Sequence, residues 1–98
     1  MNVVPKPISF IWDSGNLEKN WVKHAVHHKE SEEIYFNKPL LILSDASHSN
    51  TEKRYFAYGV TNKGRKLMIV FTIRKNSIRI ISARDQNKKE RMNYEKTT

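Results

Sequence analysis

The sequence predicts an α+β domain in which helices pack on one antiparallel sheet. Residues 66–74 and 78–84 are rich in Ile, Val and Phe, which favour strands, and the link between them is short enough for a hairpin. Segments with helical periodicity or helix-capping residues stand before these strands and after them. The 98 residues suffice for one hydrophobic core, so we expect a single domain over residues 1–98.

The chain begins with a short strand and a helix. Residues 8–12 have strand composition, and Asp13 or Ser14 can cap a helix over residues 16–27. A rotation of 100° per residue collects one stripe, which we expect to face the body of the protein: Leu17, Trp21, His24 and His28. The same rotation collects a polar arc: Asn16, Lys19, Asn20 and Lys23.

A second helix and a strand complete the first half of the chain. Residues 29–36 suit a helix, because glutamates near its start interact favourably with the positive end of the helix dipole and Pro39 prevents its continuation. Residues 40–43 form an apolar run of strand length. The turn-forming residues 44–51 predict a polar loop.

The second half of the chain supplies the rest of the sheet and a last helix. Residues 54–61 predict a strand, and a turn containing Gly64 connects it to residues 66–74. Asp85 can cap a final helix over residues 86–96. On that helix, the i, i+4, i+7 spacing predicts one shared side for Asn87, Arg91 and Tyr94.

Side chains alternate between the two faces of a strand. In residues 66–74, one face receives Leu67, Ile69, Phe71 and Ile73, and the other receives Met68, Val70, Thr72 and Arg74. In residues 78–84, one face receives Ile80, Ser82 and Arg84, and the other receives Arg79, Ile81 and Ala83. Each strand thus carries a mostly apolar row ending in an arginine, and we expect these arginines to present their guanidinium groups at one end of the sheet.

The composition excludes several classes of site. Without cysteine, the chain has no disulfide, thiolate metal site or thiol nucleophile. It has no apolar run of the ~20 residues that a membrane helix needs, and its start lacks the pattern of a signal peptide, so we expect no membrane contact and a cytoplasmic location. His24 and His28 are spaced i, i+4 without a neighbouring Glu motif, so we predict no metal and no other cofactor.

Positive charge is concentrated in the second half of the chain. Residues 1–49 have 5 Lys and Arg against 6 Asp and Glu, a net charge of −1, whereas residues 50–98 have 13 against 4, a net charge of +9. One interpretation is a lysine-rich solvated surface. The segregation favours the other, a binding surface for a polyanion such as RNA or DNA.

An ordered set of short motifs extends over residues 8–95. The motifs are Phe10-x-Trp12-Asp13, Asn20-x-x-Lys23-His24-x-Val26, Glu52-x-Arg54, Gly64-Arg65, Phe71-Thr72-x-Arg74, Arg79-Ile80-Ile81-Ser82-Ala83-Arg84 and Glu90-Arg91-x-x-Tyr94. In this order and at these spacings they resemble the BrnT toxins, the toxin halves of bacterial type II toxin–antitoxin pairs. The chain departs from the family pattern at Ala25, where glycine is usual, and at His28, where an aromatic residue is common.

The resemblance implies a RelE-like fold, with an N-terminal strand and two helices packed on an antiparallel sheet and with a C-terminal helix. It also implies a ribonuclease that arrests translation by acting on RNA. The implied partner is an antitoxin of the BrnA type with a ribbon–helix–helix segment, so that DNA is bound only through the antitoxin complex. Two alternatives remain open: a non-catalytic basic module that binds nucleic acid or an acidic protein partner, and a domain with no nucleic-acid role.

Metal-free RNA cleavage needs a clamp on the phosphate, a base for the 2′-hydroxyl, stabilisation of developing charge and an acid for the leaving oxygen. Arginine suits the clamp because its planar fork pairs with phosphate and keeps its charge. By chemistry and by position in the resemblance, the predicted catalytic residues are Lys23, His24, Arg54, Arg74, Arg84 and Tyr94. The predicted RNA-binding residues are Arg65, Arg79, Lys88 and Arg91.

Each prediction has a structural alternative. The strand arginines can cover the sheet edge with their alkyl stems, and Lys23 can be solvated surface. His24 can be a hydrogen-bonded core histidine, and Tyr94 can pack its ring on the sheet. Glu52 can act as a base or form a salt bridge with Arg54, and we favour the salt bridge.

Overall fold

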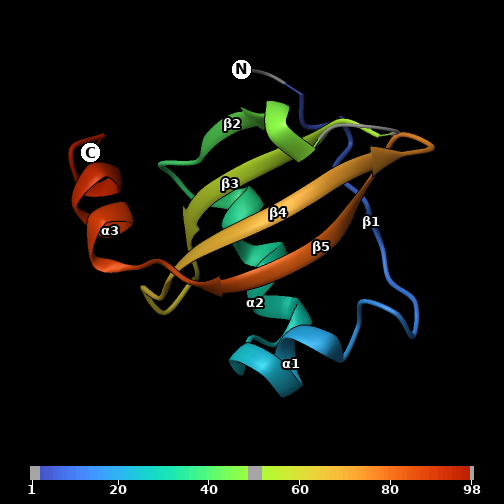
Figure 1. Cartoon of the computed structure of the whole chain (residues 1–98), viewed down its shortest axis with the longest axis horizontal. Coiled ribbons are helices and arrows are strands. Elements are labelled where there is room, and N and C mark those ends of the chain that lie inside the picture. The colour runs from blue at the N-terminus through green and yellow to red at the C-terminus, as the bar shows by residue number, and fades with distance from the viewer. Residues whose placement is uncertain (1–2, 49–51, 98) are drawn as a thin grey trace.

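The computed structural model describes residues 3–48 and 52–97, and it confirms the α+β class (Figure 1). The elements in chain order are β1 (Phe10–Ile11), α1 (Lys19–His24), α2 (His28–Glu33), η1 (Ile34–Phe36), β2 (Leu41–Asp45), η2 (Ala46–His48), β3 (Arg54–Val60), β4 (Lys66–Arg74), β5 (Ser77–Asp85) and α3 (Lys88–Glu95). The strands form one sheet in the order β1-β5-β4-β3-β2. All neighbours are antiparallel except β1 and β5, which are parallel. Residues 49–51 of the predicted polar loop lie outside the described residues.

The central hairpins form as predicted. Strand β4 has the predicted bounds, and Gly64 takes the left-handed conformation, with φ at 88°, in the turn that precedes it. In the β4–β5 turn, Lys75 and Asn76 have φ values of 50° and 62°. Positive φ at both central residues matches the right-handed twist of the flanking strands, which explains how a two-residue turn closes this hairpin.

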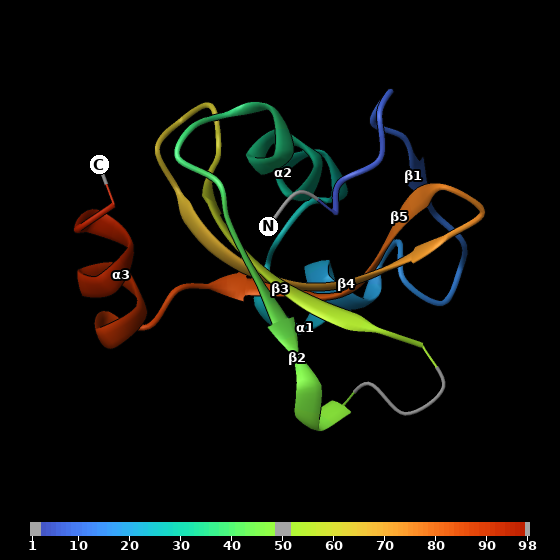
Figure 2. The same cartoon turned by 90° about the horizontal axis from the view of Figure 1, so that it is seen from above.

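The two faces of the sheet have different surroundings. One face, the core face, is covered by α2 and η1, as Figure 2 shows. Its buried cluster contains Val26, Ile34, Tyr35, Ile42, Ala57, Leu67, Ile69, Phe71, Ile78, Ile80 and Ala83. Contact is close at Gly59, where a Cβ would stand 2.7 Å from the Cβ of Ile34. The opposite face, the open face, is turned toward the viewer in Figure 1, and none of the helices that the structure describes crosses its centre.

A β-bulge in β5 corrects the predicted alternation. Val70 pairs with Ser82 and Phe71 pairs with Ile80, so Ile81 is an extra residue without a partner on β4. After the bulge the faces exchange: Ile80 and Ala83 both lie in the buried core, although strict alternation puts them on opposite faces. Arg84, paired with Met68, therefore lies on the open face and not on the face of Ile80.

The predicted orientation of the first helix is wrong. Helix α1 ends at His24, because Ala25 takes the left-handed conformation with φ at 54°, and Trp21 is 56% exposed. Two residues of the predicted polar arc face inward instead. Asn20 accepts a hydrogen bond from the Ala83 amide at 3.0 Å, and Asn16 donates one to the Ile80 carbonyl at 3.0 Å.

The backbone of β5 explains this inversion. Strand β1 pairs with β5 only at Ile78 and Arg79, so the edge of β5 beyond Arg79 has amide and carbonyl groups that no neighbouring strand satisfies. Buried backbone groups need partners, and the two asparagines of α1 and the turn before it supply them. A polar pair therefore docks this helix on the sheet.

The last helix is capped two residues later than predicted. Asn87 forms a capping box with Glu90, whereas Asp85 ends β5. Tyr94 is 2% exposed and donates a hydrogen bond to the Pro39 carbonyl, which ties α3 to the segment before β2. Arg91 is exposed, so the predicted common side of α3 is divided between the body of the protein and solvent.

Candidate functional site

The open face brings the predicted strand arginines together. Register and alternation place Arg54 on this face from β3, Arg74 from β4, and Arg79 and Arg84 from β5. The centre of the face is formed by partly buried side chains, which include Phe56, Tyr58, Val70 and Ser82. A sheet surface with aromatic rings between guanidinium groups is typical of proteins that bind a single-stranded nucleic acid.

The arginines nevertheless form two groups, because antiparallel neighbours end at opposite ends of the sheet. Arg74 pairs with Ser77, beside the β4–β5 turn, whereas Arg84 pairs with Met68, near the start of β4. Met68 and Arg74 are six residues apart, about 20 Å at ~3.3 Å per residue. The expectation that Arg74 and Arg84 lie at one end of the sheet is therefore wrong.

The first group lies at the end near the β4–β5 turn and contains Arg54, Arg74 and Arg79. Arg74 pairs with Glu52, with Nε 2.6 Å from Oε2, a partner that the prediction of a bridge between Glu52 and Arg54 did not include. Hydrogen bonds from Arg74 lower the pKa of Glu52, and the charges of Arg79 and Arg54 add to this effect. All three guanidinium groups therefore act on one carboxylate and share one local field.

Arg79 is less exposed than Arg74, with 19% of its side chain accessible against 49%. Its Nη2 lies 3.2 Å from Asp13 Oδ2, and the Asp13 carboxylate also accepts hydrogen bonds from the amides of Gly15 and Asn16. The Nε of Arg79 is buried and has no hydrogen-bond partner among the described residues. A buried donor without an acceptor is costly, so the position of Arg79 carries an energetic cost that its bond to Asp13 partly offsets.

The second group lies where α3 meets the open face. Arg84 binds Glu90 with both ends of its fork, at 2.8 and 3.1 Å, and Tyr58 lies beside them. Burial acts to raise the pKa of Glu90, but the hydrogen bonds from Arg84 and Asn87 outweigh it and lower the pKa. Burial raises the pKa of Tyr58, and the Glu90 carboxylate adds to this shift.

The other predicted residues of α3 differ in their surroundings. Tyr94 is buried with its hydroxyl on the Pro39 carbonyl, a geometry that favours a structural role over proton donation. Arg91 donates to the Gln86 carbonyl at 2.7 Å while its residue stays exposed. Lys88 is exposed in the first turn of α3.

Arg65 holds three segments of the chain together. Its guanidinium contacts Asp85 at 2.6 Å and Glu30 at 3.1 Å, and it donates to the carbonyls of Ala25 and His24 at the end of α1. These contacts occupy all three nitrogens, so the geometry favours a structural role for Arg65 over the predicted contact with RNA.

The predicted residues of α1 lie at the edge of the sheet. Lys23 is exposed, and His24 is half-buried at the C-terminus of the helix. The His24 charge contributes to the lowered pKa of Asp85, which places the imidazole near the end of β5. Because α1 docks on Ala83, both residues lie beside the part of β5 that carries Arg84.

Two of the carboxylates that pair with the open-face arginines, Asp13 and Glu90, were not predicted as their partners. Asp13 was assigned to a helix cap, and Glu90 was noted as part of a family motif. Their pairings connect residues 66 and 6 positions apart, and only the second separation is visible as a local pattern in the sequence.

Two further structural findings concern metals and membranes. The described residues contain no group of three or more His, Cys, Asp or Glu side chains that could hold a metal ion. Among the helices of residues 3–48 and 52–97, none has the length and apolar character needed to cross a membrane.

Comparison with known proteins identifies the family. A family model described as the ribonuclease toxin BrnT of type II toxin–antitoxin systems matches residues 12–90, and the motifs on the open face and α1 lie within this range. No curated protein matches the chain. The α+β architecture is consistent with a toxin fold. Because the match covers far more than half of the sequence, the chain belongs to the BrnT family of type II toxin–antitoxin ribonuclease toxins.

Proposed function

We propose that this chain is a toxin that cleaves RNA on the open face of its sheet, without a metal ion, and thereby arrests translation. The observation that carries the proposal is the presence of four arginines on that one face, from three adjacent strands. Family membership supports the ribonuclease activity.

The proposed reaction uses the 2′-hydroxyl of the RNA as nucleophile. A base removes its proton, the oxygen attacks phosphorus, and the 5′-oxygen leaves with a proton from an acid, which yields a 2′,3′-cyclic phosphate. Cations that are already in place stabilise the charge of the transition state, and loss of one such donor costs on the order of 10²–10³ in rate. Arg84 is the proposed clamp on the scissile phosphate, and Arg54 and Arg74 are proposed to hold the RNA backbone farther along the open face. His24 and Lys23 are the proposed proton-transfer groups.

Each group of arginines offers a different advantage. The group of Arg54, Arg74 and Arg79 concentrates positive charge around the Glu52 carboxylate. Arg84 lies beside Tyr58, Glu90 and the α1 edge, where acid–base groups are available. We place the scissile phosphate near Arg84 and a phosphate farther along the RNA strand near Arg79. The β4 partners of these two arginines, Met68 and Thr72, are about 13 Å apart at ~3.3 Å per residue.

Members of a type II toxin family have an antitoxin partner. We propose that the antitoxin of this chain contains a ribbon–helix–helix segment, that it binds DNA on behalf of the complex, and that it covers the open-face arginines with carboxylates. Complementary charge chiefly speeds association, so the on-rate should fall as salt rises and when Arg84 is reversed to Glu. An on-rate that ignores both changes would place the antitoxin elsewhere.

The first experiment tests the reaction. Purified chain is incubated with single-stranded RNA with and without EDTA, and the product ends are analysed. We expect equal cleavage in both conditions and 2′,3′-cyclic phosphate or 3′-phosphate ends. Loss of activity with EDTA, or 3′-hydroxyl ends, would refute the metal-free mechanism. Binding without any cleavage would favour the non-catalytic basic module.

The second experiment tests the residues. Arg74→Ala and Arg84→Ala should each relieve growth arrest. The melting temperature of Arg74→Ala should stay near that of the unaltered chain, whereas Arg84→Ala should melt lower but remain folded, because it loses the pair with Glu90. Lys63→Ala is the matched control, because Lys63 is an exposed cation in a turn away from the open face. If all three variants are equally toxic, the open face is not the site.

A further inference from the structure

We propose that the cavity between α1 and the start of α2 binds a base of the RNA substrate, with guanine as the best match. This inference rests on the proposed function. It adds a site that would select where the RNA is cleaved.

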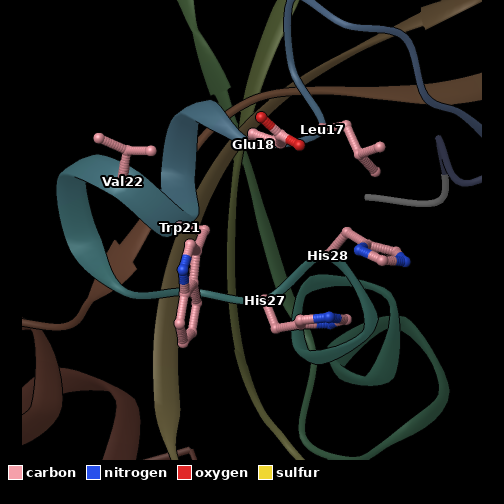
Figure 3. Close-up of a pocket in the computed structure, with 6 residues that line it drawn as sticks. All are labelled: Leu17, Glu18, Trp21, Val22, His27 and His28. Carbon is pink, nitrogen blue, oxygen red and sulfur yellow. The ribbon is translucent and has the colours of Figure 1, made fainter.

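The cavity has a volume of about 460 Å³, which is ample for a flat heterocycle. Its lining residues are Leu17, Glu18, Trp21, Val22, His27 and His28. Figure 3 shows the rings of Trp21, His27 and His28 around one space, with Leu17 and Glu18 on the side opposite the histidines. Three heteroaromatic rings and one carboxylate thus border a single opening.

The histidine wall is fixed by contacts outside the cavity. His27 caps α2, and its Nδ1 accepts a hydrogen bond from the Lys29 amide at 3.2 Å. The His28 ring stacks on His27 at 4.3 Å and also meets the edge of Trp12, which donates to Glu32 at 2.7 Å. These contacts hold both imidazoles in place before any ligand arrives, so binding does not have to order them.

The indole of Trp21 is the free platform. It is 56% exposed, and its plane lies at 78° to that of His27 with the centroids 6.3 Å apart, so the two rings do not stack on each other. An exposed indole on a small protein contributes little to the core but provides a large flat surface for stacking. Base–aromatic stacking is how single-stranded RNA is commonly held.

The charges around the cavity select the ligand class. Lys19 and Lys23 are exposed one turn apart on α1, next to the stripe that carries Val22. They would repel a cationic side chain, the other usual ligand of an aromatic cage, and they would attract the phosphates on either side of a base. Glu18 accepts hydrogen bonds from N–H groups, and the Watson–Crick edge of guanine offers two that point the same way.

The cavity is also placed where the substrate would pass. Helix α1 is docked on the edge of β5 through Asn20 and Ala83, and the neighbours Ser82 and Arg84 project from the open face. An RNA strand that leaves the open face across β5 therefore reaches α1. Lys23 and His24, the proposed proton-transfer groups, stand on the same helix as Trp21.

The test measures binding with RNA that cannot be cleaved. Short single-stranded oligonucleotides with 2′-O-methyl groups, either all uracil or with one guanine, are titrated against the unaltered chain, Trp21→Ala and Glu18→Gln by fluorescence anisotropy. Phe36→Ala is the matched control, because Phe36 is a 65% exposed aromatic residue outside the cavity. Urea denaturation of each variant verifies the fold.

We expect Trp21→Ala to weaken binding of the guanine oligonucleotide by about tenfold, the scale of one stacked base. Phe36→Ala should leave the affinity unchanged, and Glu18→Gln should reduce the preference for guanine over uracil. If Trp21→Ala fails to fold, Glu18→Gln still decides, because unchanged base preference would overturn the assignment.

Other outcomes separate this proposal from the proposed function. Trp21→Ala with normal RNA affinity overturns the base site, and weakened antitoxin binding in that variant would assign the cavity to the protein partner. Unaltered chain that binds blocked RNA through Trp21 but leaves unblocked RNA intact supports the base site and overturns the ribonuclease reaction. If Trp21→Ala cleaves RNA at the same sites as the unaltered chain and binds it with the same affinity, the ribonuclease reaction is supported and the base site is overturned.

Discussion

Replacing Asn20 by alanine should weaken the fold through one backbone group. The Asn20 side chain is 4% exposed and accepts the Ala83 amide at 3.0 Å, on a stretch of β5 edge that β1 does not reach. Asn20→Ala leaves this buried N–H without an acceptor, which costs about 1–3 kcal/mol. For a chain of this size, each kcal/mol corresponds to a shift of roughly 4–8 °C in melting temperature.

The measurement is urea denaturation followed by circular dichroism, together with a thermal melt. The matched control is Lys19→Ala, which removes an exposed side chain from the preceding position of the same helix and should change stability by less than about 0.5 kcal/mol. If the two variants are equally stable, the asparagine does not dock α1, and the explanation given for its burial fails.

Three further predictions follow from the packing and the ion pairs. Gly59→Ala should destabilise the fold by about 1–3 kcal/mol, because the added Cβ would stand 2.7 Å from the Cβ of Ile34, and a melt at the unaltered temperature would contradict the close approach. Arg65→Lys should lower the free energy of unfolding by about 1–2 kcal/mol in urea titration, since an ammonium group cannot reach four acceptors on three segments; an equal free energy would argue against this role. The pKa values of Asp85 and Glu90 are lowered in the folded state, so their ion pairs with Arg65 and Arg84 stabilise the fold fully above the ordinary carboxyl pKa of about 4. This contribution is lost as the pH falls below that value. Urea titrations from pH 7 to pH 3 should show the decrease in the free energy of unfolding, and the decrease should be smaller in Glu90→Gln.

The sequence predicted the elements well where one local rule decides. The bounds of β4 follow from an unbroken apolar run, and the turn at Gly64 follows from a residue that tolerates positive φ. The arginines of β3, β4 and β5 were recognisable as functional candidates because of their residue type and family motif. Their presence on one face of the sheet results from the registers of β3 with β4 and of β4 with β5, which could not be predicted from the sequence.

The sequence prediction failed where backbone or side-chain groups far away in the sequence determine which side chain is buried or paired. Asn20 was assigned to a polar arc because helical periodicity assumes that buried faces are apolar, whereas the unpaired edge of β5 requires a polar partner. The pairing of Arg79 with Asp13 joins residues that are 66 positions apart in the sequence. The pairing of Arg74 with Glu52 joins the end of β4 to the segment before β3. The cavity at Trp21 was missed because the same periodicity placed this indole inside the protein.

The bulge at Ile81 adds one residue to β5, and this extra residue decides which of the later side chains lie on the open face. Deleting this one residue would restore strict alternation, and every side chain after it would exchange faces: Ala83 would turn to solvent and Arg84 would turn into the apolar cluster. Substitutions at the same position keep the count of residues and leave the exchange intact. In this protein, an insertion or deletion in β5 is therefore more harmful than almost any replacement, since it moves a charge across the sheet without altering the identity of any remaining amino acid.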